Sequence, residues 1–153
     1  MVISLFQGTI QEVVALAVLM PIVASMGGNA GTQTLTITVR ALATKELTTY
    51  NALRTFRKEL AVGFLNGCLF AVLAGVLTFF WFNDLENANI LGGVIAGAMV
   101  INMVVAGFAG VALPVLLDRL KIDPAIASGV FVTTVTDVVG FLSFLGLASI
   151  TLL

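Results

Sequence analysis

The chain has 153 residues, of which 59% are hydrophobic and only 10% are charged, and its net charge is −1. Because a soluble domain carries about 25% charged residues, this composition predicts a membrane protein. Histidine is absent and Cys68 is the one cysteine, which excludes imidazole catalysis, His or Cys zinc sites and an intrachain disulfide. The sequence contains no nucleotide loop, nucleophile–base pair or cofactor motif of an enzyme, and no basic patch for nucleic acid. Any metal must therefore be held by oxygen ligands.

The charged residues fall in clusters, and the gaps between the clusters predict four transmembrane helices within a single domain, residues 1–153. The apolar segments lie near residues 10–40, 60–82, 89–117 and 124–153. Each reaches the roughly 20 residues that a helix needs to cross a bilayer. None of them alternates with the period of two that a barrel strand would show. The predicted fold class is therefore all-α, a polytopic bundle of membrane helices.

The charges of the loops orient these helices. Residues 40–59 carry five Lys and Arg and residues 118–123 carry two, whereas residues 83–88 carry none. By the positive-inside rule, the first two loops are predicted to be cytoplasmic, and the 83–88 loop and the C-terminus external. The N-terminus would then also be external, so we expect one further helix upstream, of which Met1–Gln7 would be the end.

A polar run, MGGNAGTQ from Met26 to Gln33, interrupts the first predicted helix. Asn29 and Gln33 are four residues apart and share one face of a helix. Such a run can lose helical regularity and turn its carbonyl groups toward a cavity, and a packed polar seam between helices is the alternative. The spacing GxxxG, typical of closely packed membrane helices, occurs elsewhere at Gly63/Gly67 and Gly93/Gly97.

Asp137 is the one charged residue in the last predicted helix, 13 residues after Pro124. This spacing places it roughly 20 Å along the helix, near the middle of the membrane. An ionised carboxylate costs about 2.5–3.5 kcal/mol there, so Asp137 is either protonated, faces water or meets a mobile cation. Nearby hydroxyls and glycines favour water or a cation, and a protonated acid bonded to a threonine is the alternative.

The predicted depth links Asn29 to Asp137. Asn29 lies 11 residues before Arg40, so both polar residues are expected roughly 16–20 Å from the same membrane face. A carboxylate, amides, hydroxyls and glycine carbonyls at one level predict an all-oxygen site typical of Mg²⁺, Ca²⁺ or Mn²⁺. Because Mg²⁺ gives up its water reluctantly, the ion is expected to stay largely hydrated. The further residues predicted to line a pore are Gln33, Asn102, Gly129, Thr134 and Thr136.

Two long segments resemble the MgtE family of Mg²⁺ channels and transporters. PIVASMGGNAGTQTLTITVRALATKEL, residues 21–47, is similar to the family's second membrane helix. LPVLLDRLKIDPAIASGVFVTTVTDVVGF, residues 113–141, is similar to its fourth-to-fifth helix segment. The resemblance covers essentially the whole chain. It implies a homodimer with five membrane helices per subunit and an ion path along the dimer axis.

The resemblance also implies roles for particular residues. Asp137, in TDVVG, would be the central site for hydrated Mg²⁺. The residues implied to line the pore or to present a carbonyl to the ion are Gly27, Gly28, Asn29 and Thr133. Val130 stands where the family often has proline. The cytoplasmic N-terminal and CBS domains that regulate the family's pore lie outside this chain.

The sequence thus predicts a Mg²⁺-selective channel or transporter, with Mn²⁺, Co²⁺ and Ca²⁺ as further candidate ions and with a second copy and membrane lipid as partners. Two alternatives stay open. The first is a proton-coupled cation carrier in which Asp137 titrates, and its flux would follow a pH gradient. The second is a non-transporting membrane assembly protein whose glycines serve helix association only, in which Asn would replace Asp137 without loss of activity.

Overall fold

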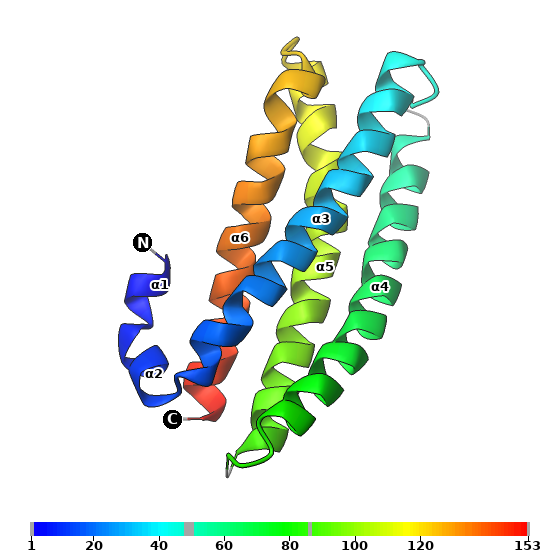
Figure 1. Ribbon diagram of the computed structural model, residues 1–153. Coiled ribbons are helices and arrows are strands. Elements are labelled where there is room, and N and C mark those ends of the chain that lie inside the picture. Colours follow the sequence, from blue (N-terminus) through cyan, green and yellow to red (C-terminus); the bar gives the residue numbers. More distant parts are fainter. Residues whose placement is uncertain (1, 48–50, 86, 153) are drawn as a thin grey trace.

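Four long antiparallel helices make up most of the computed structural model (Figure 1). The structure describes residues 2–47, 51–85 and 87–152, without the side chains of residues 52 and 127. The long helices are α3 (Ala15–Ala43), α4 (Ala52–Trp81), α5 (Ala88–Arg119) and α6 (Pro124–Thr151). Each contains a segment long and apolar enough to cross a membrane, and the described residues include no strand. The predicted all-α bundle with four membrane-spanning helices is therefore confirmed.

The helix ends differ from the apolar segments where charged residues continue a helix beyond its apolar part. Helix α4 begins at Ala52 rather than near residue 60. Its first turns are helical but carry charged residues, so hydropathy does not include them. Helix α3 begins at Ala15 rather than near residue 10. Hydropathy marks the part of a helix that suits a bilayer, whereas hydrogen bonding sets where the helix ends.

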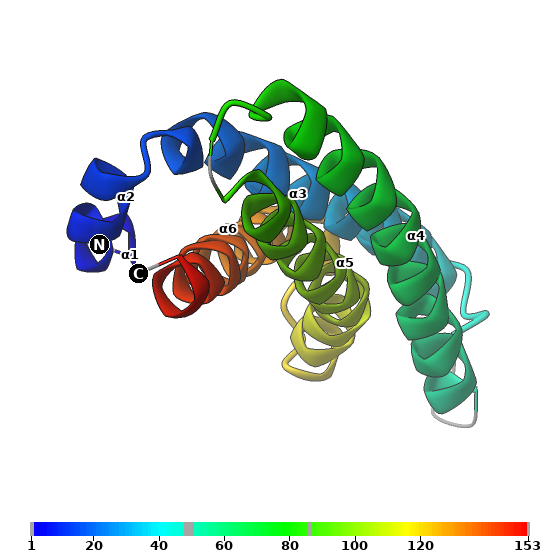
Figure 2. The same ribbon diagram turned by 90° about the horizontal axis from the view of Figure 1, so that it is seen from below.

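Residues 2–12 form two short helices, α1 (Val2–Leu5) and α2 (Gln7–Glu12), separated by a turn at Phe6. The chain breaks again at residues 13–14 before α3, and α1 and α2 lie beside the end of α6 (Figures 1 and 2). The segment Met1–Gln7, expected to be the end of an upstream helix, thus carries one helical turn, with Met1 outside the described residues.

Local hydrogen bonds fix the turn between α5 and α6. The Asp123 carboxylate accepts a hydrogen bond from the Ala125 N–H at 2.9 Å, with proline as the first residue of α6. Helix α5 ends at Arg119, and two residues later Lys121 has a φ of 58°, a conformation usually taken by glycine. The Ile122 N–H then donates to the Leu117 carbonyl at 2.9 Å, which satisfies one of the last carbonyls of the helix.

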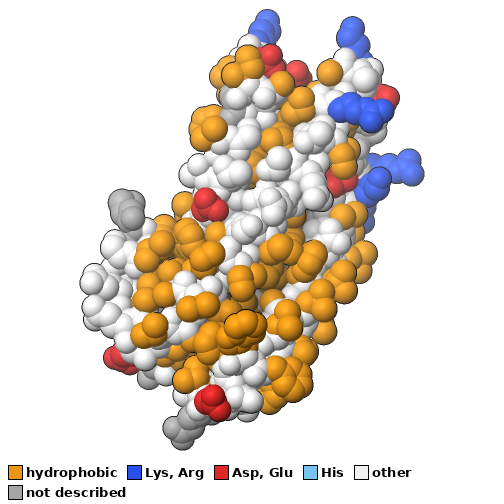
Figure 3. Space-filling model, in the orientation of Figure 1, with side chains coloured by type: hydrophobic (Ala, Val, Ile, Leu, Met, Phe, Trp, Pro, Cys, Tyr) orange, Lys and Arg blue, Asp and Glu red, His pale blue; other side chains and the backbone are white. Residues whose placement is uncertain are grey.

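Helix α5 is the centre of the bundle, since it packs against α3, α4 and α6 (Figure 2). Buried side chains of α3, α5 and α6 form the larger apolar core, with Leu16, Ile95 and Phe144 fully enclosed. Large hydrophobic side chains also cover much of the outer surface, and Trp81 and Ile126 are 80% and 82% exposed. Figure 3 shows these apolar side chains over the face and the basic ones gathered at one end. Such a surface suits lipid.

Glycines let α4 approach α5 closely. A Cβ atom on Gly63 would lie 2.7 Å from the Met103 carbonyl oxygen, and one on Gly92 would lie 3.0 Å from the Gly75 carbonyl oxygen. The close packing predicted at Gly63/Gly67 is therefore confirmed. The same prediction is wrong for Gly93, which has nothing within 4 Å, because the neighbouring Gly92 is the residue that faces α4.

We expect Gly63→Ala to destabilise the chain more than Gly93→Ala. Both variants gain the same helix propensity, but only the methyl group at residue 63 meets the backbone of α5. The difference should be about 1–3 kcal/mol, the usual cost of overpacking a core. Thermal unfolding of both variants in the same detergent measures it, and equal stabilities would show that α4 and α5 are not in close contact.

Candidate functional site

The two polar segments recognised in the sequence lie side by side in the structure. Gly28 of α3 faces Thr133 and Thr136 of α6, because a Cβ atom on Gly28 would be about 4 Å from each side chain. The α3 segment that holds Asn29 therefore lies at the level of the α6 segment that holds Asp137. Helices α3 and α6 pack along each other, so the match in depth is a property of the fold.

Polar side chains in the middle of these two helices remain exposed in the single chain. The exposed amide side chains of α3 are Asn29 and Gln33, and the exposed polar side chains in the middle of α6 are Thr134 and Asp137. Gly28, Gly129 and Thr133 are half-buried beside them. We call these seven residues the polar face. An exposed polar group at this depth cannot be left against lipid tails without a large cost, so this face must meet water, protein or an ion.

Helix α3 stays regular through the run from Met26 to Gln33, so the predicted loss of helical regularity is wrong. No described glycine has a positive φ. The carbonyl of Gly28 also accepts a hydrogen bond from the Thr32 hydroxyl at 2.8 Å. Backbone carbonyls of α3 are thus engaged within the helix, and Asn29 and Gln33 are its exposed amide side chains.

The threonine hydroxyls of α6 donate to carbonyls of their own helix. Thr133 donates to Gly129 and Val130 at 3.1 Å, and Thr134 donates to Val130 at 2.7 Å. Thr136 donates to the Thr133 carbonyl at 3.0 Å. Hydroxyls bonded in this way keep oxygen lone pairs for a ligand but have no proton to offer.

Asp137 is the charged member of the polar face. It is exposed, and it has no ion-pair partner among the residues that the structure describes. Within the same residues, no group of three or more His, Cys, Asp or Glu side chains could hold a metal ion. A single chain therefore offers one exposed carboxylate on α6 and two exposed amides on α3, which can attract a cation but not strip its water.

Three residues predicted to line a pore are buried inside the bundle: Gly27, Asn102 and Thr136. Asn102 is fully buried on α5, and its Nδ2 donates to the Val23 carbonyl of α3 at 2.8 Å. Thr136 is also fully buried, between α6 and α3. The number of residues from a helix end gives depth but not the direction of a side chain, so depth alone grouped Asn102 and Thr136 with Asn29.

Sequence reasoning missed Glu59, which it assigned to a cytoplasmic loop. In the structure Glu59 is buried in α4, and its Oε2 accepts a hydrogen bond from the Thr34 hydroxyl at 3.3 Å. The signal was present in the spacing, because Glu59, Gly63 and Gly67 follow one another at intervals of four. That spacing places Glu59 on the face of α4 that packs against α5.

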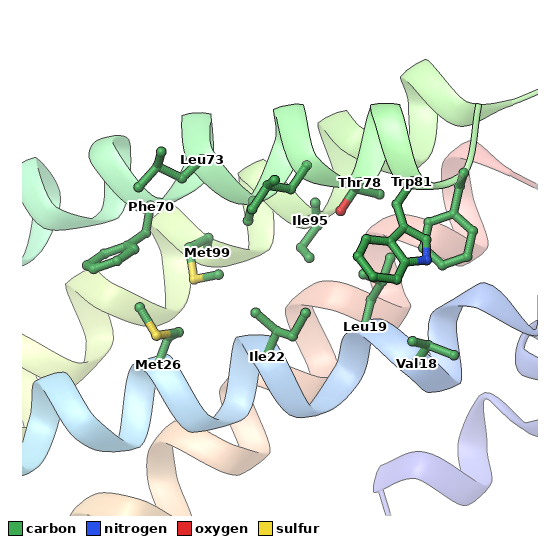
Figure 4. A pocket seen from close by; sticks show the side chains of 13 residues that line it. Val18, Leu19, Ile22, Met26, Phe70, Leu73, Thr78, Trp81, Ile95 and Met99 are labelled. Atoms are coloured by element: carbon green, nitrogen blue, oxygen red, sulfur yellow. The ribbon is translucent and has the colours of Figure 1, made fainter.

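A large cavity lies away from the polar face. It is a groove of about 490 Å³ between α3, α4 and α5, where Ile22 and Met26 face Phe70 across the side chains of Ile95 and Met99 (Figure 4). Apart from one threonine, the side chains that line it are apolar. A groove of this kind suits hydrocarbon and offers no ligands to a hydrated cation.

The two basic loops lie at the same end of the bundle. Residues 44–51 join α3 to α4 and residues 120–123 join α5 to α6, whereas the acidic loop at residues 82–87 lies at the opposite end (Figure 1). The charge difference between the two ends is the feature on which the predicted orientation depends.

Comparison with known proteins agrees with this architecture. The family model MgtE, described as divalent cation transporter, matches residues 20–147. The magnesium transporter MgtE of Bacillus subtilis is 33% identical over 148 residues, which are 97% of this chain and 32% of that protein. The magnesium transporter MgtE of Thermus thermophilus is 36% identical over 147 residues, 96% of this chain and 32% of that protein. The chain therefore spans about a third of the length of these curated relatives. It belongs to the MgtE family, a family of divalent cation transporters and not of enzymes.

Proposed function

We propose that this chain forms the ion-conducting part of a magnesium channel or transporter, in which hydrated Mg²⁺ passes between two copies and Asp137 is the central ion site. The observation that carries the proposal is the exposed carboxylate of Asp137 in the middle of a membrane-spanning helix. Membership of the MgtE family and two relatives named as magnesium transporters support the choice of ion.

The need for a second copy follows from charge. One Asp137 supplies a single negative charge, whereas a divalent cation is neutralised by two. A two-fold axis beside α6 supplies the second carboxylate, and two-fold symmetry is the commonest in homo-oligomers. It also covers the polar face of each chain with that of the other, and leaves a polar channel between them.

The mode of binding follows from the ligands available. Asn29 and Gln33 present amide groups, which hold water through hydrogen bonds as well as they hold a cation directly. Because Mg²⁺ binds its water tightly, the ion keeps its inner shell, and the amides and Asp137 contact that shell. Larger divalent cations with looser water shells fit the same arrangement less well, which is the origin of the proposed selectivity.

The orientation in the membrane is part of the proposal. Residues 40–59 and 118–123 face the cytoplasm, and residues 83–88 and the C-terminus face outward, in the inner membrane of a bacterium. The basic residues of the first two loops support this orientation. Regulation by cytoplasmic N-terminal and CBS domains, which the resemblance implies, stays a prediction.

We expect Asp137→Asn and Asp137→Ala to reduce Mg²⁺ uptake into liposomes to the level of protein-free vesicles. The first variant keeps the shape of the side chain and loses its charge, and no other carboxylate is exposed in the middle of a described helix. The matched control is Asp84→Asn, the same change in the exposed loop at the end of α4, which should leave uptake unchanged.

Uptake of Mg²⁺ by Asp137→Asn at the rate of the unchanged chain would contradict the proposed site. Uptake by the unchanged chain that depends on an imposed pH gradient would instead favour a proton-coupled carrier. If no ion moves with the unchanged chain, a membrane assembly role without transport replaces the proposal.

The orientation has its own test, in a chain whose Cys68 is replaced by Ser. A cysteine at Asn87 should react with a membrane-impermeant reagent in intact cells, and one at Lys121 only after the cells are made permeable. Both positions are exposed in loops at opposite ends of the bundle. The reverse pattern of labelling would overturn the orientation without touching the proposed ion site.

A further inference from the structure

The side chain of Asn102 fills a niche between the two helices that carry the polar face. A Cβ atom on Gly27 of α3 would lie 2.6 Å from Asn102 Cγ, and one on Gly140 of α6 would lie 2.7 Å from Asn102 Nδ2. Both glycines are therefore needed for α3 and α6 to close around this side chain. The amide acts as a spacer that three helices share.

The amide nitrogen of Asn102 is hydrogen-bonded, but the amide oxygen is not. Its Nδ2 donates to the Val23 carbonyl at 2.8 Å, which ties α5 to α3. Its Oδ1 is buried and has no partner, and it is the one buried side-chain atom in that state within the described residues. A leucine has nearly the same shape and leaves no acceptor unpaired, so stability alone does not account for an amide here.

The niche lies within one turn of the polar face along both α3 and α6. Gly27 is two residues before Asn29 on α3, and Gly140 is three residues, close to one turn, after Asp137 on α6. A change in the spacer would shift or rotate α3 against α6. The distance between the Asn29 amide and the Asp137 carboxylate would change with it.

We infer that Asn102 is a positioning residue for the ion path: its buried amide sets the spacing and rotation of α3 against α6, and thereby how well the polar face fits a hydrated Mg²⁺. This inference rests on the proposed function. It assigns Asn102 a part in selectivity without contact with the ion. The hydrogen bond to Val23 fixes the orientation of the Asn102 side chain between α3 and α6. An apolar side chain of equal size cannot form this bond.

The test is Asn102→Leu in the full chain, reconstituted in liposomes, with the ratio of Mg²⁺ to Ca²⁺ uptake as the readout. This ratio does not depend on how many molecules fold, so a merely structural role would not move it. We expect thermal stability at least equal to that of the unchanged chain and a ratio lowered roughly 10-fold, as when outer partners of a metal site are removed. The matched control, Asn66→Leu at an exposed position of α4, should leave the ratio unchanged.

A second pair of variants tests the spacer itself and serves if Leu at residue 102 prevents folding. Gly140→Ala alone forces a methyl group against the Asn102 amide and should lower the ratio. Adding Asn102→Ala makes room for that methyl group and should restore part of the ratio. If the double variant instead changes the uptake ratio by the product of the two single effects, the two residues act separately. That result would overturn the inference.

Failure of the inference and failure of the proposed function give different results. If the unchanged chain moves Mg²⁺ and Asp137→Asn abolishes it, the proposed function stands. An unchanged uptake ratio in Asn102→Leu then overturns the positioning role alone. If the unchanged chain moves no divalent cation, the proposed function fails first and the inference fails with it.

Discussion

A carboxylate in the middle of a membrane helix, with no positive side chain to pair with it, is the constraint on which this structure depends. Asp137 is exposed in the single chain, and so are the amides of Asn29 and Gln33 on the neighbouring helix α3. Lipid tails cannot solvate these groups, so their side of α3 and α6 must face water, protein or an ion. Helix α4 packs mainly against α5, and its exposed large apolar side chains suit lipid rather than water. The bundle thus has one side for hydrocarbon and one side for charge.

Close packing through small residues allows this division. Gly63 and Gly92 bring the backbones of α4 and α5 together without large side chains between them. Gly27 and Gly140 leave room for Asn102, whose side chain packs between α3 and α6 and donates a hydrogen bond to α3. Without these glycines, the helices of the polar face would move apart and the oxygen ligands would lose their common level. The same residues therefore serve both stability and the geometry of the proposed ion path.

Much of this architecture could be predicted from the sequence, because hydropathy and charge vary along the chain in one dimension. The four spanning helices, the cap at Asp123 and the shared depth of Asn29 and Asp137 all follow from position along a helix. The direction in which a side chain points depends on the neighbouring helices, which the sequence does not specify. Hence depth alone grouped the buried Asn102 with Asn29, and Glu59 was assigned to a loop although its spacing with Gly63 marks the packed face of α4.

The central claim is that two copies share one divalent cation between their Asp137 side chains. The most direct test is to count Mg²⁺ bound per chain at equilibrium in the purified, detergent-solubilised protein. The account predicts one tightly bound ion for every two chains, and its loss in Asp137→Asn while the two chains stay associated. One ion per chain, or undiminished binding in the variant, would contradict a shared site at this residue.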